Sequence, residues 1–145
     1  MWKLAWIVTF AAFAAALAAL SAPAKADTAM SDMRGTWKGD SQSIVMGVGP
    51  HHPGAKKGEP LLMSVPFTLV IDKQDGRRFS GTFSSANHSE TVIFMVSRAG
   101  AMYMADDDGY SVATMLGPDQ MEICYLHSSE ARRIAACTEM SKQKP

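Results

Sequence analysis

MEICYLHSSEARRIAACTEM, residues 121–140, is the stretch that decides the fold, because it holds both cysteines of the chain in one predicted hairpin. Apolar and polar residues alternate on either side of its centre, which is the pattern of two half-buried strands joined by a turn. Folding the stretch between Glu130 and Ala131 places Cys124 directly opposite Cys137. Directly opposed side chains lie close enough for a disulfide. The sequence therefore predicts that bridge on the outer face of the hairpin.

The same register predicts which side chains of the hairpin face the core. They are Met121, Ile123, Tyr125, Ile134 and Ala136. A bridge that closes a loop of about 14 residues stabilises a fold by roughly 3 kcal/mol in the chain-entropy model.

Six further short runs precede this hairpin, at residues 35–47, 62–72, 77–84, 91–97, 101–105 and 110–116. Turn residues separate them, including Asp75-Gly76, a strong hairpin signal, and a long loop at residues 47–60 rich in Gly, Pro, His and Lys. Trp37 and Ile44 differ in parity, which predicts a bulge or kink in the first run. Eight strands in chain order predict an all-β, up-and-down antiparallel barrel, with a flattened β-sandwich as the alternative.

The first 26 residues have the pattern of a secretory signal peptide. Lys3 precedes an apolar run at residues 4–20, and Ala24-Lys25-Ala26 is a small-x-small cleavage site. A retained membrane anchor is the alternative, because 17 apolar residues are at the lower limit for a span. Cleavage leaves a flexible lead-in at residues 27–34, a barrel domain at 35–141 and a polar tail at 142–145.

The charge of the chain limits which classes of partner it is expected to bind, and its cysteine content indicates the cellular compartment. Cleavage removes Lys3 and Lys25 from the 14 basic residues, which leaves 12 against 14 acidic ones in a mature chain of 119 residues. A mildly acidic chain without a basic stripe is not expected to bind nucleic acid or, after cleavage, a membrane. Two cysteines in a domain of this size predict one disulfide and a periplasmic or secreted location. No cofactor is predicted.

Gly35-Thr36-Trp37, at the start of the first predicted strand, resembles the Gly-x-Trp motif of the calycin barrels, the lipocalins and avidins. The resemblance implies that the indole closes the barrel floor beneath a cation from near the last strand. Arg132, Arg133 and Lys142 are the candidates for that cation. Avidin-type biotin pockets use further tryptophans that the mature chain lacks, so biotin binding is not implied. The overall pattern resembles small exported bacterial barrels.

A second, shorter resemblance covers residues 96–103, VSRAGAMY. This segment is similar to the Ser-Gly-x-x-Tyr segment of periplasmic inhibitors of C-type lysozyme, but the chain lacks that family's downstream Trp motif. An inhibitor or another protein-interaction module, acting through the loop at 47–60 with His51 and His52, is therefore an alternative function.

The leading hypothesis is a non-enzymatic exported protein that holds a small apolar molecule inside the barrel. An eight-stranded barrel either fills its interior with side chains or holds one small ligand. The side chains expected to line the cavity are Trp37, Phe67, Leu69, Phe79, Phe83, Met102 and Tyr110.

Other chemistries have thinner support in the sequence. His51 and His52 are candidate zinc or copper ligands, since imidazole binds both metals. The turn at residues 106–109, DDDG, resembles a fragment of a calcium loop. His88 and Glu90 are near enough in sequence to form an acid–base pair. No nucleophile elbow or phosphate-binding loop is present in the sequence, and no catalytic residue is predicted.

Overall fold

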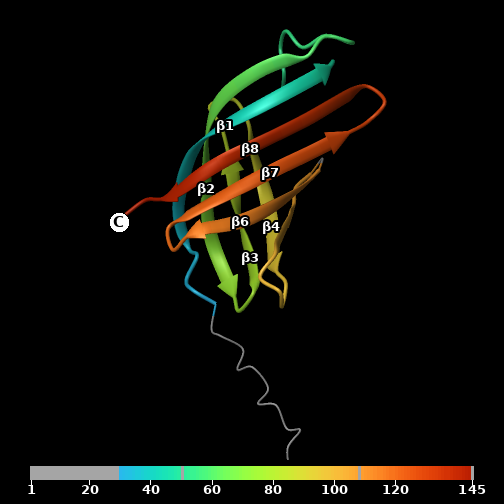
Figure 1. The fold of residues 1–145 in the computed structure, drawn as a ribbon. Helices are drawn as coiled ribbons and strands as arrows, with labels where there is room; N and C mark the ends of the chain where they lie inside the picture. Colours follow the sequence, from blue (N-terminus) through green and yellow to red (C-terminus); the bar gives the residue numbers. More distant parts are fainter. Residues whose placement is uncertain (1–29, 50, 108, 145) are drawn as a thin grey trace, which may run out of the picture.

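The computed structural model describes residues 30–49, 51–107 and 109–144, and the regular elements of these ranges are all β-strands. Eight antiparallel strands close into a barrel in chain order, because β8 pairs with β1 as well as with β7 (Figure 1). The strands are β1 (Gly35–Gly47), β2 (Leu61–Asp75), β3 (Arg78–Ser84), β4 (Ser89–Val96), β5 (Met102–Ala105), β6 (Tyr110–Gly117), β7 (Gln120–Ser128) and β8 (Arg132–Lys142). The predicted up-and-down barrel is confirmed, and the flattened sandwich is wrong.

The predicted signal peptide at residues 1–26, and the alternative of a membrane anchor there, lie outside the described residues. In the described ranges, no helix combines the length and the apolar character that a bilayer crossing requires.

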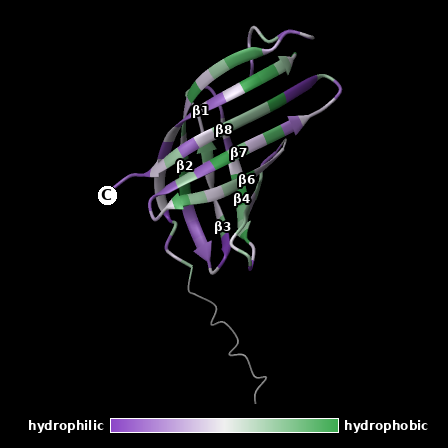
Figure 2. Cartoon of the chain, in the orientation of Figure 1, coloured by the Kyte–Doolittle hydropathy of each residue, from purple (hydrophilic) through white to green (hydrophobic). Residues whose placement is uncertain are grey.

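Alternation along β2 shows how the sequence forms the barrel wall. Leu69 and Ile71 point inward and are 0% and 2% exposed, whereas Val70 between them is 40% exposed. Gly76 follows β2 with a φ of 58°, the left-handed conformation that the Asp-Gly turn requires. Figure 2 shows hydrophobic and hydrophilic residues mixed along the strands, as expected when one face meets a core and the other meets solvent.

The bulge predicted in β1 is wrong. The register of β1 with β2 runs without a shift from Gly35 opposite Ile71 to Val45 opposite Leu61. Trp37 and Val45 are both fully buried, whereas Ile44 is 44% exposed. Odd-numbered residues therefore face the core along the whole of β1, from Trp37 near its start to Val45 near its end, whereas Ile44 faces outward.

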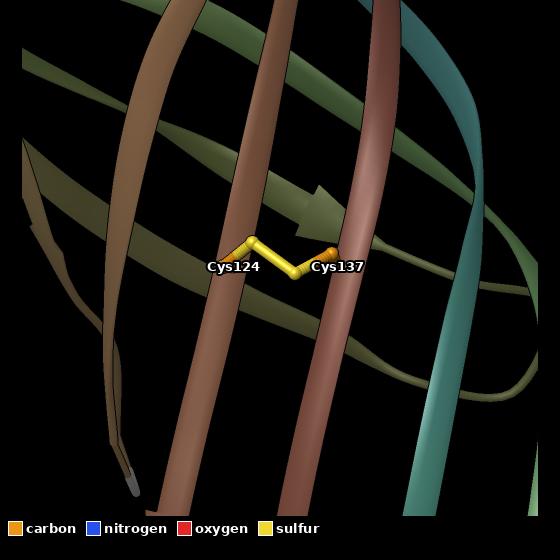
Figure 3. Close-up of a disulfide and its surroundings, with 2 residues drawn as sticks. All are labelled: Cys124 and Cys137. Carbon is orange, nitrogen blue, oxygen red and sulfur yellow. A yellow bond between two sulfur atoms is a disulfide. The ribbon is translucent and has the colours of Figure 1, made fainter.

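The β7–β8 hairpin has the predicted register, with Cys124 opposite Cys137. The two cysteines form a disulfide, with Cα atoms 4.1 Å apart (Figure 3). Met121, Ile123 and Ile134 are buried, and Tyr125 and Ala136 are half-buried, so the predicted core face is confirmed. The bridge lies on the outer face, so neither cysteine side chain points into the barrel interior.

Trp37 closes one end of the barrel, which we call the floor. Its indole is fully buried, and its Nε1 donates a hydrogen bond of 2.9 Å to the carbonyl oxygen of Met33. The ammonium of Lys142 lies 5.7 Å from the ring centroid, within reach of a cation–π interaction. Of the three predicted cations, Lys142 is thus the one above the indole. Arg132 lies at the opposite end of β8.

The described part of the predicted flexible lead-in is instead part of this floor. Met33 is 1% exposed and packs in the core, and its backbone N–H donates to Gln74 Oε1 at 2.8 Å. Lys142 donates to the carbonyl of Asp32 at 2.8 Å, which ties the two ends of the described chain together. The predicted tail is also partly structured, since Lys142 belongs to β8. The apolar character of Met33 explains the correction, because it completes the cover over Trp37.

The one strong perturbation of an acid lies in this segment. Hydrogen bonds from the side chain and then the backbone N–H of Arg34 hold the pKa of Asp32 well below its ordinary value. The same contact raises the pKa of Arg34. Both side chains are exposed, and neither lines the cavity described next.

Candidate ligand-binding cavity

A cavity of about 160 Å³ occupies the half of the barrel opposite the floor, and we call its open end the mouth. All eight strands contribute to its wall. The apolar part of the wall consists of Met63, Val65, Phe67, Phe83, Val92, Met104, Ile123 and Ile134. Phe67 and Phe83 stack with ring centroids 4.7 Å apart.

The distribution of side-chain size explains why only one half of the barrel is hollow. The floor half is filled by large side chains, including Met33, Trp37, Met102, Met121 and Met140. Toward the mouth, β1 and β8 instead turn small side chains inward: Ser41, Ser43, Ala136 and Thr138. On β6, Ser111 lies opposite the large Tyr125 of β7. Because an eight-stranded interior is just wide enough to be filled by large side chains, small ones at one level leave a space.

The loop at 47–60 packs against the barrel at the mouth. Gly47 donates from its backbone to the carbonyl of Lys56 at 2.8 Å, and Ala55 is buried in a second cluster with Val45 and Ile134. This packing carries His51 and His52 to the cavity wall.

One side of the mouth holds a contact between two imidazoles and a carboxylate. The rings of His51 and His88 have centroids 4.3 Å apart. The Nε2 of His88 lies 3.4 Å from Glu90 Oε2, so the predicted pairing of these two residues is present. The three residues come from the loop at 47–60, the β3–β4 turn and β4. They place ionisable groups at the edge of a cavity whose wall is mainly apolar.

Another side of the mouth is built around Arg132. Its Nε donates to His127 Nε2 at 3.2 Å, and the His127 ring lies 6.4 Å from the ring of Tyr125. Two glycines make room for these side chains: a Cβ at Gly49 would lie 2.8 Å from the Arg132 guanidinium, and one at Gly109 would overlap the ring of Tyr125.

The structure places only two of the seven predicted cavity residues in the wall, Phe67 and Phe83. Four others, Trp37, Leu69, Phe79 and Met102, belong to the buried cluster of the floor half. Tyr110 is wrong as an interior residue, since it is 62% exposed. β6 turns Ser111 and Ala113 inward against the larger Tyr125 and Ile123, and at this level of the strand Tyr110 and Val112 face solvent.

The polar side chains of the wall were missed because they are small or appeared to belong to turns. Ser41, Ser111 and Thr138 are buried, while Asp106 and Arg132 lie near strand ends. The inward parity of Ser111 and Ala113, opposite the large inward residues of β7, was the available signal for the hollow.

The predicted metal ligands His51 and His52 both line the cavity, although the ring that His51 contacts is that of His88. Among the described residues, the one group of three potential ligands within 4.8 Å of one another is Glu122 with Cys124 and Cys137. Those two sulfurs are bonded to each other and are therefore not thiolate ligands. In the acidic turn, the backbone N–H of Asp106 donates to the carbonyl of Gly109 at 3.4 Å, as in an ordinary hairpin turn.

The fold and the cavity define a closed eight-stranded barrel with an internal space open at one end. No protein-family model matches the chain, and no curated protein matches it in sequence. Among solved structures, it is similar to an S-type phycobiliprotein lyase, CPES, from Guillardia theta, at 12% identity and a TM-score of 0.35, over 78% of this chain and 89% of that one. Of the predicted resemblance to calycins, the closed eight-stranded antiparallel barrel is confirmed by the strand pairing, and no family match confirms the assignment.

This comparison corrects the prediction of a non-enzymatic protein. That prediction treated a small barrel without a catalytic motif as a simple binding protein, and the matching structure is named a lyase. A likeness of this strength assigns no activity, substrate or residue role to the present chain.

Proposed function

We propose that the protein binds a small, largely apolar molecule in the cavity at the mouth half of the barrel. The observation that carries the proposal is the hollow of about 160 Å³ within a wall of apolar side chains. An apolar cavity of about 150 Å³ in a protein core accepts a single benzene ring. The proposed ligand is therefore about the size of one six-membered ring, with any larger part extending through the mouth.

Filling the cavity tests this function. Ala136 lines the cavity, whereas Ala135, its neighbour on β8, faces solvent. We expect Ala136→Phe to weaken binding of toluene, measured by titration calorimetry, by about tenfold or more, because the added ring occupies the ligand's space. The matched variant Ala135→Phe should bind toluene as the unmodified protein does.

Two results would overturn the proposal. One is a failure of toluene and other ring-sized probes to bind the unmodified protein. The other is equal binding by both variants, once each has shown a cooperative unfolding transition. As a separate measurement, native mass spectrometry of protein from its natural compartment would identify any ligand that co-purifies.

A metal site at the mouth is the second candidate function. The contact between the His51 and His88 rings, with Glu90 beside His88, supports it, because two imidazoles and a carboxylate suit zinc. Their ligand atoms do not all lie within 4.8 Å of one another, so zinc binding would require side-chain rotation. We expect zinc titration to show one bound ion, and the double variant His51→Ala/His88→Ala to lose it. Equal zinc binding by that variant and the unmodified protein would eliminate this site.

Export through an oxidising compartment is part of the proposal. The disulfide between Cys124 and Cys137 supports it, because such bridges persist mainly in the periplasm and outside cells. Its test is the intact mass of the protein recovered from that compartment, which should correspond to a chain beginning at Asp27 with both cysteines oxidised.

A further inference from the structure

Three buried hydroxyl side chains lie in the wall of the cavity, and we call them the hydroxyl belt: Ser41, Ser111 and Thr138. Their exposed fractions are 5%, 6% and 4%, so each is more than nine-tenths buried. Their side-chain oxygens form no hydrogen bond with another described residue, and they are not fully enclosed, so they are accessible from the cavity. Among the described residues, these three are the polar side chains that are classed as buried.

Two of the three hydroxyls are close neighbours. Ser41 of β1 lies directly opposite Thr138 of β8, and both side chains point inward. Directly opposed residues on antiparallel strands have Cβ atoms about 5 Å apart. On the neighbouring strands, Val65 of β2 lies opposite Ser41, and Ile123 of β7 lies opposite Thr138. The pair is therefore a polar spot framed by apolar side chains.

A hydroxyl that opens onto an interior cavity needs a partner there, because polar groups in protein interiors are paired with protein, water or ligand. Alanine and valine would fit the same positions without that need, since they have nearly the shapes of serine and threonine. Valine also has a higher strand preference than serine. Packing alone therefore does not account for three hydroxyls at the level of the cavity.

We propose that the hydroxyl belt binds a neutral oxygen-bearing group of the ligand, such as an alcohol, a phenol or a carbonyl. A hydroxyl both donates and accepts hydrogen bonds, so it matches each of these groups. A charged group is disfavoured at this depth, because burial of an unpaired charge costs more than burial of a neutral dipole. This inference rests on the proposed function and fixes the ligand's orientation: its oxygen lies inside and its remaining part points to the mouth.

Phenol and toluene are matched probes for the belt, since they differ by a hydroxyl in place of a methyl group. Titration calorimetry of the unmodified protein and of the double variant Ser41→Ala/Thr138→Val gives the preference for phenol over toluene in each. We expect the double variant to lower this preference by about tenfold, which is the value of one buried hydrogen bond. The control variant Ser141→Ala/Thr114→Val removes two hydroxyls from outward positions and should leave the preference unchanged.

The outcomes separate this inference from the proposed function. If both probes bind and the double variant has the same preference as the unmodified protein, the belt does not recognise the ligand, and the cavity remains a binding site. That result is also expected if ordered water satisfies the hydroxyls. If neither probe binds the unmodified protein, the proposed function fails and this inference fails with it.

Discussion

Trp37 shows how a single residue closes one end of the barrel. Its indole fills the floor, and its Nε1 donates to the carbonyl of Met33. We predict that Trp37→Phe lowers the free energy of unfolding by about 2–4 kcal/mol, because it removes buried volume and leaves that carbonyl without its donor. Urea denaturation measures the loss. Lys142→Met, which removes the cation near the ring, should cost only about 1 kcal/mol, so an equal loss in both variants would contradict this account.

Thr138 is expected to have the opposite effect on stability. The residue is 4% exposed, and its hydroxyl reaches the cavity without a hydrogen bond to another described residue. We predict that Thr138→Val raises the free energy of unfolding of the ligand-free protein by about 1 kcal/mol, since it replaces an unpaired polar atom with a methyl group. Thermal unfolding without ligand gives the comparison. A lower melting temperature would show that the hydroxyl is satisfied in the folded protein.

At the scale of residues, sequence patterns predict which side chains point into the barrel better than they predict which of them line the cavity. The prediction that Phe67 and Phe83 face the interior is correct, because both lie in register with buried apolar residues two positions along their strands. The prediction for Tyr110 is wrong, because both faces of β6 carry apolar residues and the inward face near the mouth holds Ser111 and Ala113. Periodicity alone cannot choose between two apolar faces. The choice depends on which face meets the large inward side chains of β7.

At the scale of elements, the β7–β8 hairpin is held by a covalent bond as well as by its ladder. Cys124 and Cys137 are 13 residues apart in sequence. We predict that the double variant Cys124→Ala/Cys137→Ala loses about 3 kcal/mol of unfolding free energy, because its unfolded chain is no longer restricted by the loop. Urea denaturation under oxidising conditions measures the loss.

Reduction supplies the control for this prediction. The reduced unmodified protein should unfold at the same urea concentration as the double variant, since both lack the bridge and keep the same strands. If the variant were as stable as the oxidised protein, the bridge would contribute nothing to folding.

Strand order and hairpin register were predictable because tight turns connect neighbours and leave few alternative pairings. The β7–β8 register followed from the position of one turn and was confirmed residue by residue. The internal geometry of single strands was less predictable. The predicted bulge in β1 requires Ile44 to face the core as Trp37 does, whereas Val45 occupies the interior position.

At the scale of the whole molecule, the location of the cavity was beyond the sequence patterns. The strands of a closed barrel are tilted and staggered. The pattern of one strand therefore does not show which residues of the other strands lie at the same level along the barrel axis. Ser41 and Thr138 become neighbours only when β8 closes on β1. The contact between His51 and His88 likewise needs the loop at 47–60 to pack against the mouth.

The boundary of the folding unit gives the last prediction. The predicted domain begins at residue 35, but Met33 is buried in the core and Gln74 hydrogen-bonds to the backbone of both Ser31 and Met33. A chain of residues 35–145 should therefore be less stable than one of residues 27–145 by about 3 kcal/mol or more, because it loses a buried methionine and the partner of the Trp37 indole. Urea denaturation of both chains measures the difference. Equal stability of the two chains would mean that residues 30–34 contribute nothing to the fold and that Trp37 closes the floor without them. In that case Met33→Ala in the longer chain should also leave the free energy of unfolding unchanged.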